Sequence, residues 1–137
     1  MAMTGRCLCG AVSYEATAAP LFGGNCYCTD CRKTTSSHSA VVAIPEGSVT
    51  FKGPLSNYTK QGGSGKPVTR AFCPTCGTAM YSKGESNAGV LMLKAGTLDD
   101  VEAFKPMASI YASRAPSWDK PPADVPAFPE MPPRPPS

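Results

Sequence analysis

Seven cysteines in three clusters constrain this chain of 137 residues more than any other feature. They form a CxC pair at Cys7 and Cys9, a CxCxxC group within 26–31, and a CxxC pair at Cys73 and Cys76. An odd number of cysteines without a secretory signal argues against a disulfide framework, because one thiol would be left over. Thiolates at these spacings favour zinc, whereas an iron-sulfur cluster would take four cysteines and leave three unexplained. We therefore expect a zinc protein.

The spacing of the clusters favours one closed site and one incomplete site. FCPTCG, at 72–77, has the form of a zinc knuckle, and Gly77 suits the positive φ that such turns often need. A knuckle supplies half a site, and the CxC pair can supply the other half. The structural zinc ligands are then Cys7, Cys9, Cys73 and Cys76, and the ligands of a second, catalytic zinc are Cys26, Cys28 and Cys31. In the alternative, the CxCxxC group borrows a cysteine, which leaves the other site with three ligands from two separated segments.

The fourth ligand of the three-cysteine site decides its chemistry. His38, the only histidine, and Asp30 are the candidates within the chain, and either would close the site. If the position is kept for a small thiol, the ion can hold that sulfur deprotonated and present it to an electrophile. Three thiolates donate electrons strongly, so water activation for hydrolysis fits less well. Arg32 and Lys33 could bind the carboxylates of an acidic thiol such as glutathione.

Short β-branched or aromatic runs separated by Gly, Pro, Asn and Ser predict an all-β domain. The expected strands are 11–16, 39–44, 48–53, 56–60, 68–72, 78–83, 89–96 and 108–114. CTDCRKTTSS, at 28–37, could form one or two helical turns, so we expect little helix. QGGSGKP, at 61–67, reads as an exposed turn between two strands, because it lacks the Lys-Ser/Thr ending of a phosphate loop.

Proline enrichment marks a change near the C-terminus. Nine of the fifteen prolines lie in the last 22 residues, and proline cannot donate a ladder hydrogen bond. We predict a zinc-binding β domain at 1–115 and a Pro-rich tail at 116–137 that packs on the domain or trails from it. Trp118 and Phe128 favour partial docking. MPPRPPS, at 131–137, could alternatively serve as a peptide ligand, although a trailing end is the simpler interpretation.

Composition excludes several other classes of protein. The formal net charge of +3 is spread over single Lys and Arg residues, and seven thiolates with two zinc ions would bring it to zero, so nucleic-acid binding is not expected. No window is apolar for long enough to cross a membrane, and the N-terminus lacks an apolar signal segment. We expect a cytoplasmic protein. The sequence leaves the assembly state open, with a homodimer among the alternatives.

Several motifs resemble the glutathione-dependent formaldehyde-activating enzyme family, to which centromere protein V is related. They are RCLCGAVSYE at 6–15, CYCTDCRKTT at 26–35, FCPTCGTAMY at 72–81, AGTLDD at 95–100, IYASRAPSW at 110–118 and PAFPEMP at 126–132. The similarity covers about residues 5 to 131. One departure is visible at His38, where many members carry an aromatic or small residue.

The resemblance implies a fold, a ligand set and an activity. The fold would consist of several coiled antiparallel sheets, shared with a small zinc protein that binds Rab GTPases. The family pattern gives Cys7, Cys9, Cys73 and Cys76 the structural zinc and Cys26, Cys28 and Cys31 the catalytic zinc, which agrees with the count of ligands. The activity would be that of a carbon-sulfur lyase joining formaldehyde to glutathione.

A conserved metal scaffold does not fix a substrate, so two other functions stay open. In the first, both zinc ions only brace the loops of a protein-binding module. In the second, the three-cysteine site stores or transfers zinc. The substrate thiol and its electrophile are not determined by the sequence.

Overall fold

The computed structural model describes residues 2–63 and 65–131. The chain divides into two compact units. The first comprises Met1–Phe22 and Val42–Phe104, and the second comprises Gly23–Val41 and Lys105–Ser137.

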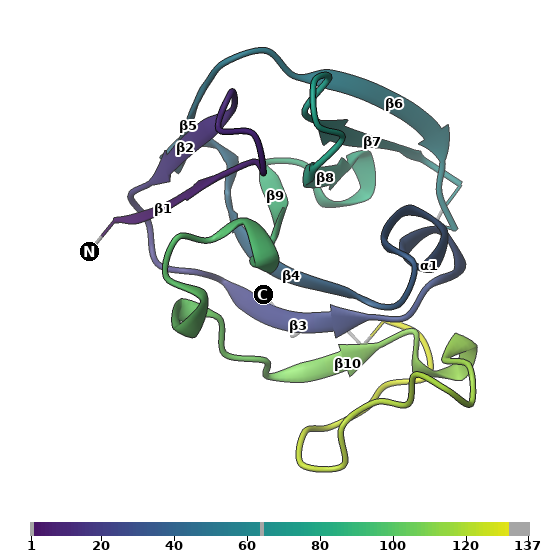
Figure 1. Cartoon of the computed structure of the whole chain (residues 1–137). Coiled ribbons are helices and arrows are strands. Elements are labelled where there is room, and N and C mark those ends of the chain that lie inside the picture. The colour runs from purple at the N-terminus through teal and green to yellow at the C-terminus, as the bar shows by residue number, and fades with distance from the viewer. Residues whose placement is uncertain (1, 64, 132–137) are drawn as a thin grey trace. The chain divides into compact units, whose positions relative to one another are not determined.

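Ten strands and one α-helix are present in the described part of the chain (Figure 1). The strands are β1 Met3–Arg6, β2 Ser13–Ala16, β3 Phe22–Cys26, β4 Ser39–Pro45, β5 Val49–Lys52, β6 Ser56–Gln61, β7 Pro67–Phe72, β8 Ala79–Gly84, β9 Val90–Lys94 and β10 Ala108–Ile110. The helix, α1, is Thr29–Thr35. Short 3-10 turns occupy Glu46–Ser48, Glu85–Asn87, Ala95–Thr97, Val101–Ala103 and Ala112–Arg114. The expected all-β class with little helix is confirmed.

The first unit contains an antiparallel three-stranded sheet in the order β1-β2-β5. Alternation along β2 buries Tyr14 and Ala16 and exposes Glu15, as a half-buried strand requires. The Tyr14 hydroxyl shares a hydrogen bond of 2.8 Å with the Thr97 hydroxyl, and the Tyr14 ring lies 5.4 Å from the Phe51 ring. The loop that carries the first cysteine pair connects the paired strands β1 and β2 of this sheet.

A second sheet of the first unit runs from the later residues of β4 through β9, β8 and β7 to β6. Strands β6, β7, β8 and β9 pair antiparallel with their sequence neighbours. The expected turn at 61–67 is confirmed for its described residues between the strands, but Gln61 and Pro67 themselves pair at the ends of β6 and β7. The buried side chains Ile44, Met80 and Leu93 form the centre of this unit's core. The turn after β7 carries the CxxC pair.

The second unit contains β10, β3 and the first residues of β4, in that spatial order. β10 runs parallel to β3, with Ile110 opposite Cys26, so the antiparallel expectation does not extend to this pair. Residues 126–130 lie alongside β10. The Ser109 N–H donates to Pro126 O at 2.8 Å, and the Phe128 N–H donates to Ser109 O at 2.8 Å. This part of the tail is hydrogen-bonded to its own unit.

Several boundaries differ from the expected ones. The strands β1 and β3 were not predicted; β3 has the sequence FGGNC, whose glycines and asparagine have low strand propensity, so its pairing rather than its composition makes it a strand. β10 ends at Ile110 because Tyr111 takes a left-handed conformation, with φ 55°. The helix falls within 28–37, as predicted.

The tail differs from expectation at one aromatic residue. Phe128 is half-buried, but Trp118 is 68% exposed, so the expected docking of Trp118 is wrong. The boundary between a domain at 1–115 and a tail at 116–137 stays a prediction. All of the proposed peptide ligand except Met131 lies outside the described residues. Within the described chain, no helix combines the length and the apolar character needed to span a membrane.

Candidate metal centres

Two loops of the first unit bring Cys7, Cys9, Cys73 and Cys76 together. In the loop after β1, the Cys7 N–H donates to Val12 O at 2.9 Å, and the turn closes through Gly10, whose φ is 82°. In the loop after β7, the Cys73 N–H donates to Thr78 O at 2.9 Å, and Gly77 has φ 78°, as predicted. Left-handed backbone is unfavourable for residues with a Cβ, so glycine permits both tight turns.

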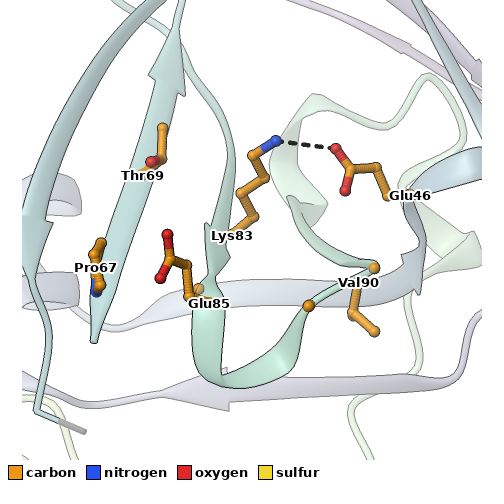
Figure 2. Close-up of a pocket in the computed structure, with 9 residues that line it drawn as sticks. Glu46, Pro67, Thr69, Lys83, Glu85 and Val90 are labelled. Carbon is orange, nitrogen blue, oxygen red and sulfur yellow. Dashed lines mark hydrogen bonds and ion pairs between the residues drawn. The ribbon is translucent and has the colours of Figure 1, made fainter. Parts of the chain in front are cut away.

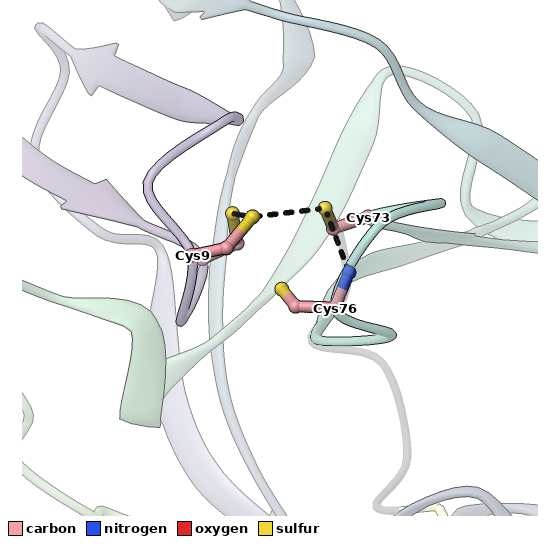
Figure 3. Close-up of side chains that lie close together, drawn as sticks. Cys9, Cys73 and Cys76 are labelled. Carbon is pink, nitrogen blue, oxygen red and sulfur yellow. Dashed lines mark hydrogen bonds between the residues drawn. The ribbon is translucent and has the colours of Figure 1, made fainter.

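The sulfur atoms of this four-cysteine cluster all lie within 4.8 Å of one another, and Figure 3 shows Cys9, Cys73 and Cys76 close together. The Cys7 and Cys9 sulfurs are 3.7 Å apart, and the Cys9 and Cys73 sulfurs are 3.8 Å apart. Four thiolates around zinc, each with a Zn–S bond of about 2.3 Å, define a tetrahedron with edges of roughly 3.8 Å. The residues therefore fit a tetrahedral metal ion.

Hydrogen bonds and burial give the thiols of this cluster different pKa values. The Thr78 hydroxyl first, and backbone N–H groups of Thr78 and Cys9 next, lower the pKa of the Cys76 thiol to about 5. The Ala11 N–H favours the Cys9 thiolate, but burial and the neighbouring sulfurs outweigh it and raise the pKa of Cys9 to about 11. Four adjacent thiolates repel one another, so a bound cation would be needed to hold all four deprotonated at neutral pH.

The second unit positions Cys26, Cys28 and Cys31 around the start of α1. Cys26 ends β3, Cys28 is the N-cap of the helix, and Cys31 lies in its first turn. The Cys28 sulfur accepts a hydrogen bond from the Cys31 N–H at 3.2 Å, so it replaces the oxygen of an ordinary cap. All three sulfurs lie within 4.8 Å of one another, which is close enough for one ion to bind them.

The three thiols of this cluster also disfavour one another's ionisation. Hydrogen bonds with Cys28 and Cys31, followed by burial, raise the pKa of the Cys26 thiol above its ordinary value. Without a cation the cluster therefore keeps at least one proton at neutral pH. A metal ion would reverse this preference, because its charge stabilises all three thiolates.

Neither internal candidate for a fourth ligand joins this cluster. Within residues 2–63 and 65–131, no histidine, aspartate or glutamate has a ligand atom within 4.8 Å of all three sulfurs. His38 instead shares a hydrogen bond of 3.0 Å between its Nδ1 and the Asp119 carboxylate, which also accepts from the His38 N–H at 2.8 Å. The His38 ring lies 5.0 Å from that of Tyr27. His38 thus fastens the tail segment around Asp119 to its own unit.

Sequence reasoning placed Arg32 and Lys33 beside the cluster, and they lie in the last turn of α1. It missed Asp119, because a partner 81 positions from His38 leaves no local signal. It also missed Thr78, although a hydroxyl two residues after a candidate ligand cysteine is recognisable as a donor or acceptor for that sulfur. The role of Arg32 and Lys33 stays a prediction.

A separate pocket lies within the first unit, between β7, β8 and the turn before β9 (Figure 2). Its volume is about 270 Å³, and Thr69, Lys83 and Glu85 line it with both polar and charged groups. Lys83 Nζ lies 3.0 Å from the carboxylate of Glu46. No cysteine lines this pocket, so it is not part of either cluster.

Comparisons with known proteins agree with the cysteine pattern. The model of the glutathione-dependent formaldehyde-activating enzyme family matches residues 2–114. No curated protein matches the chain. A crystal structure of a Rhodobacter sphaeroides protein, a structural genomics target, aligns with a TM-score of 0.58 and 24% identity, covering 72% of this chain and 89% of that chain. At that identity the likeness shows the fold alone.

Proposed function

The chain belongs to the glutathione-dependent formaldehyde-activating enzyme family, and from this premise we propose that it is a zinc-dependent carbon-sulfur lyase that joins formaldehyde to glutathione. The observation that carries the proposal is the difference between the two clusters. Four cysteine sulfurs gather in one and three in the other, and no described His, Asp or Glu completes the second set. A ligand set with three protein donors is typical of a catalytic rather than a structural zinc ion.

In this proposal Cys7, Cys9, Cys73 and Cys76 hold a structural zinc ion, and Cys26, Cys28 and Cys31 hold the catalytic one. Zinc at the second cluster would supply a Lewis acid that favours the deprotonated form of a thiol substrate. Cys28 also caps α1, so the start of the helix holds this ligand sulfur in place. A reducing cytoplasm would keep the seven cysteines as thiols and supply reduced glutathione.

The reaction requires no oxidant. The glutathione sulfur forms a bond to the formaldehyde carbon, the carbon-oxygen π bond breaks, and the proton that leaves the thiol ends on oxygen. The product is S-hydroxymethylglutathione, and the reverse reaction is the lyase direction. The chain would orient the glutathione molecule. Arg32 and Lys33, in the last turn of the helix that carries Cys31, would provide positive charge for its carboxylates.

The decisive experiment measures S-hydroxymethylglutathione formation by exchange NMR at equilibrium, with zinc-loaded protein, glutathione and formaldehyde. We expect faster exchange than in the protein-free mixture, and a loss of the added rate in Cys28→Ser. Glu85→Gln, an exposed change in the first unit, is the matched control and should retain the rate. A wild-type rate equal to the spontaneous one would refute this choice of substrates.

The zinc-transfer alternative is separated by chelator kinetics. A transfer protein should release the second ion within seconds to a chromogenic chelator and should not change the exchange rate. The enzyme should retain both ions during turnover.

A further inference from the structure

Tyr111 has an unusual backbone conformation at the end of β10. Only Ser36 and Tyr111 among the described non-glycine residues have positive φ, at 79° and 55°. For Ser36 the reason is local, because it ends α1 and its N–H donates to Arg32 O. Tyr111 instead precedes the 3-10 turn Ala112–Arg114, and a bulky side chain is disfavoured in this region. Such strain persists where the surroundings hold a residue in place, often at functional sites.

Tyr111 lies beside the three-cysteine cluster, in the same unit. Its neighbour Ile110 is opposite Cys26 in the parallel pair of β10 and β3, and the Tyr27 N–H donates to Ile110 O at 3.0 Å. Burial first, and then the charges of Cys26 and Cys28, raise the pKa of the Tyr111 hydroxyl. Tyr111 therefore directly follows the residue of β10 that lies opposite Cys26 of the cluster.

A cation and an anion are fixed next to the same tyrosine. The Arg114 guanidinium lies over the Tyr111 ring, 5.2 Å from its centroid, which is a cation-π geometry. Arg114 Nη1 lies 2.9 Å from a carboxylate oxygen of Glu130, and both side chains remain about half exposed, at 44% and 57%. The Tyr111 N–H donates to Glu130 O at 3.3 Å, so Tyr111 is linked to both charged residues.

This arrangement suits an α-amino-acid head group. A single cation recognises a carboxylate, but a zwitterion needs both signs at ion-pair distance from each other. The γ-glutamyl end of glutathione carries an α-carboxylate and an α-ammonium on one carbon, whereas its glycine end carries only a carboxylate. Arg32 and Lys33 offer positive charge alone, while Arg114 and Glu130 offer both signs.

We propose that Arg114 and Glu130 form the subsite for the γ-glutamyl end of the thiol substrate, with the Arg114 guanidinium binding the α-carboxylate and the Glu130 carboxylate binding the α-ammonium. Tyr111 is a positioning residue, because its ring holds the guanidinium in place. The inference rests on the proposed function, since it takes glutathione as the substrate. It adds specificity determinants from the segment after β10 to the cysteines that come from β3 and α1.

The test compares two thiols by calorimetric titration of the zinc-loaded protein. Glutathione carries the zwitterion, and N-acetylcysteinylglycine keeps the thiol and the glycine carboxylate without it. We expect Arg114→Gln to weaken glutathione binding about tenfold, as the loss of a charge-assisted hydrogen bond does, and to leave the second thiol unaffected. Glu130→Gln should show the same selectivity.

Two Tyr111 variants test positioning. Tyr111→Phe keeps the ring and should bind glutathione within about twofold of wild type. Tyr111→Asn removes the ring, and asparagine tolerates left-handed backbone, so it should behave like Arg114→Gln. Lys83→Gln removes an ion pair of similar exposure, 43% for each side chain, in the other unit, and should leave both affinities unchanged.

The outcomes separate this inference from the proposed function. Suppose that wild type binds glutathione, and that Arg114→Gln weakens the binding of both thiols equally or of neither. The proposed γ-glutamyl subsite is then refuted, and the proposed function stands. If wild type binds neither thiol, both are wrong. Circular dichroism confirms folding of each variant, and Glu130→Gln decides the question if Arg114→Gln does not fold.

Discussion

The two cysteine clusters should differ in what they contribute to stability, and a pair of serine variants measures the difference. The four-cysteine cluster joins loops distant in the chain, because Cys9 and Cys73 are 64 positions apart. In the three-cysteine cluster, Cys26 and Cys31 are only five positions apart. A bound ion acts as a cross-link, and the stabilisation from a cross-link grows with the length of the loop it closes.

The entropy of loop closure gives the expected stabilisation from each bound ion. The entropy relation for a cross-link predicts about 4 kcal/mol for a loop the size of the four-cysteine cluster and about 2 kcal/mol for the five-position span. In a domain of this length, 1 kcal/mol shifts Tm by roughly 3–5 °C. We therefore expect Cys76→Ser to lower Tm by roughly 15 °C, and Cys28→Ser by no more than about 10 °C, when each variant loses its ion.

The assay is differential scanning calorimetry with zinc content measured on the same samples. Thr75→Ser, an exposed change within the loop that carries Cys76, is the matched control and should leave Tm and both ions unchanged. A Cys28→Ser variant that unfolds as readily as Cys76→Ser would refute the division into a bracing site and a catalytic site. So would a Cys76→Ser variant with wild-type Tm and one zinc ion fewer.

Three further predictions concern other features of the structure. Gly77→Ala should destabilise the protein by about 1–2 kcal/mol, because φ is 78° there and a Cβ is disfavoured by backbone strain alone; Gly47→Ala, with open space and no positive φ, should be near neutral in the same urea titration. The hydrogen bond to Glu46 raises the pKa of Lys83, so the stability from this pair is present below the ordinary lysine pKa and lost as pH rises above it. The free-energy difference between wild type and Glu46→Gln should be about 0.5 kcal/mol at pH 8 and vanish above about pH 11, and a difference that grows with pH would contradict this sign. Asp119→Ala should release the tail from His38 and speed amide exchange at the His38 N–H, whereas Asp124→Ala, an exposed neighbour, should not; equal exchange in both variants would show that the contact with Asp119 does not hold this loop.

Much of the first unit follows from local sequence. Alternating apolar residues predict β2, and β-branched and aromatic runs predict β5 through β9, because strand propensity and burial act over a few residues. The strand and the strand end that the sequence did not predict have non-local causes. β3 contains two glycines and an asparagine, and only its partners in the sheet make it a strand. β10 ends before the predicted residue 114 because Tyr111 has a left-handed backbone conformation. No neighbouring residue type predicts that conformation.

The sequence by itself determined which cysteines could serve as metal ligands, because the type and short spacing of these residues limit the number of ligands that each cluster can offer. The sequence also predicted that the CxC and CxxC segments meet, whereas only the tertiary structure decided the partner of His38 and the pairing of β10 with β3. The loops at Cys9 and Cys73 meet across 64 positions, and Asp119 binds His38 from 81 positions away. Such contacts depend on sheet pairing and turn geometry throughout a unit, so a short window of sequence cannot encode them.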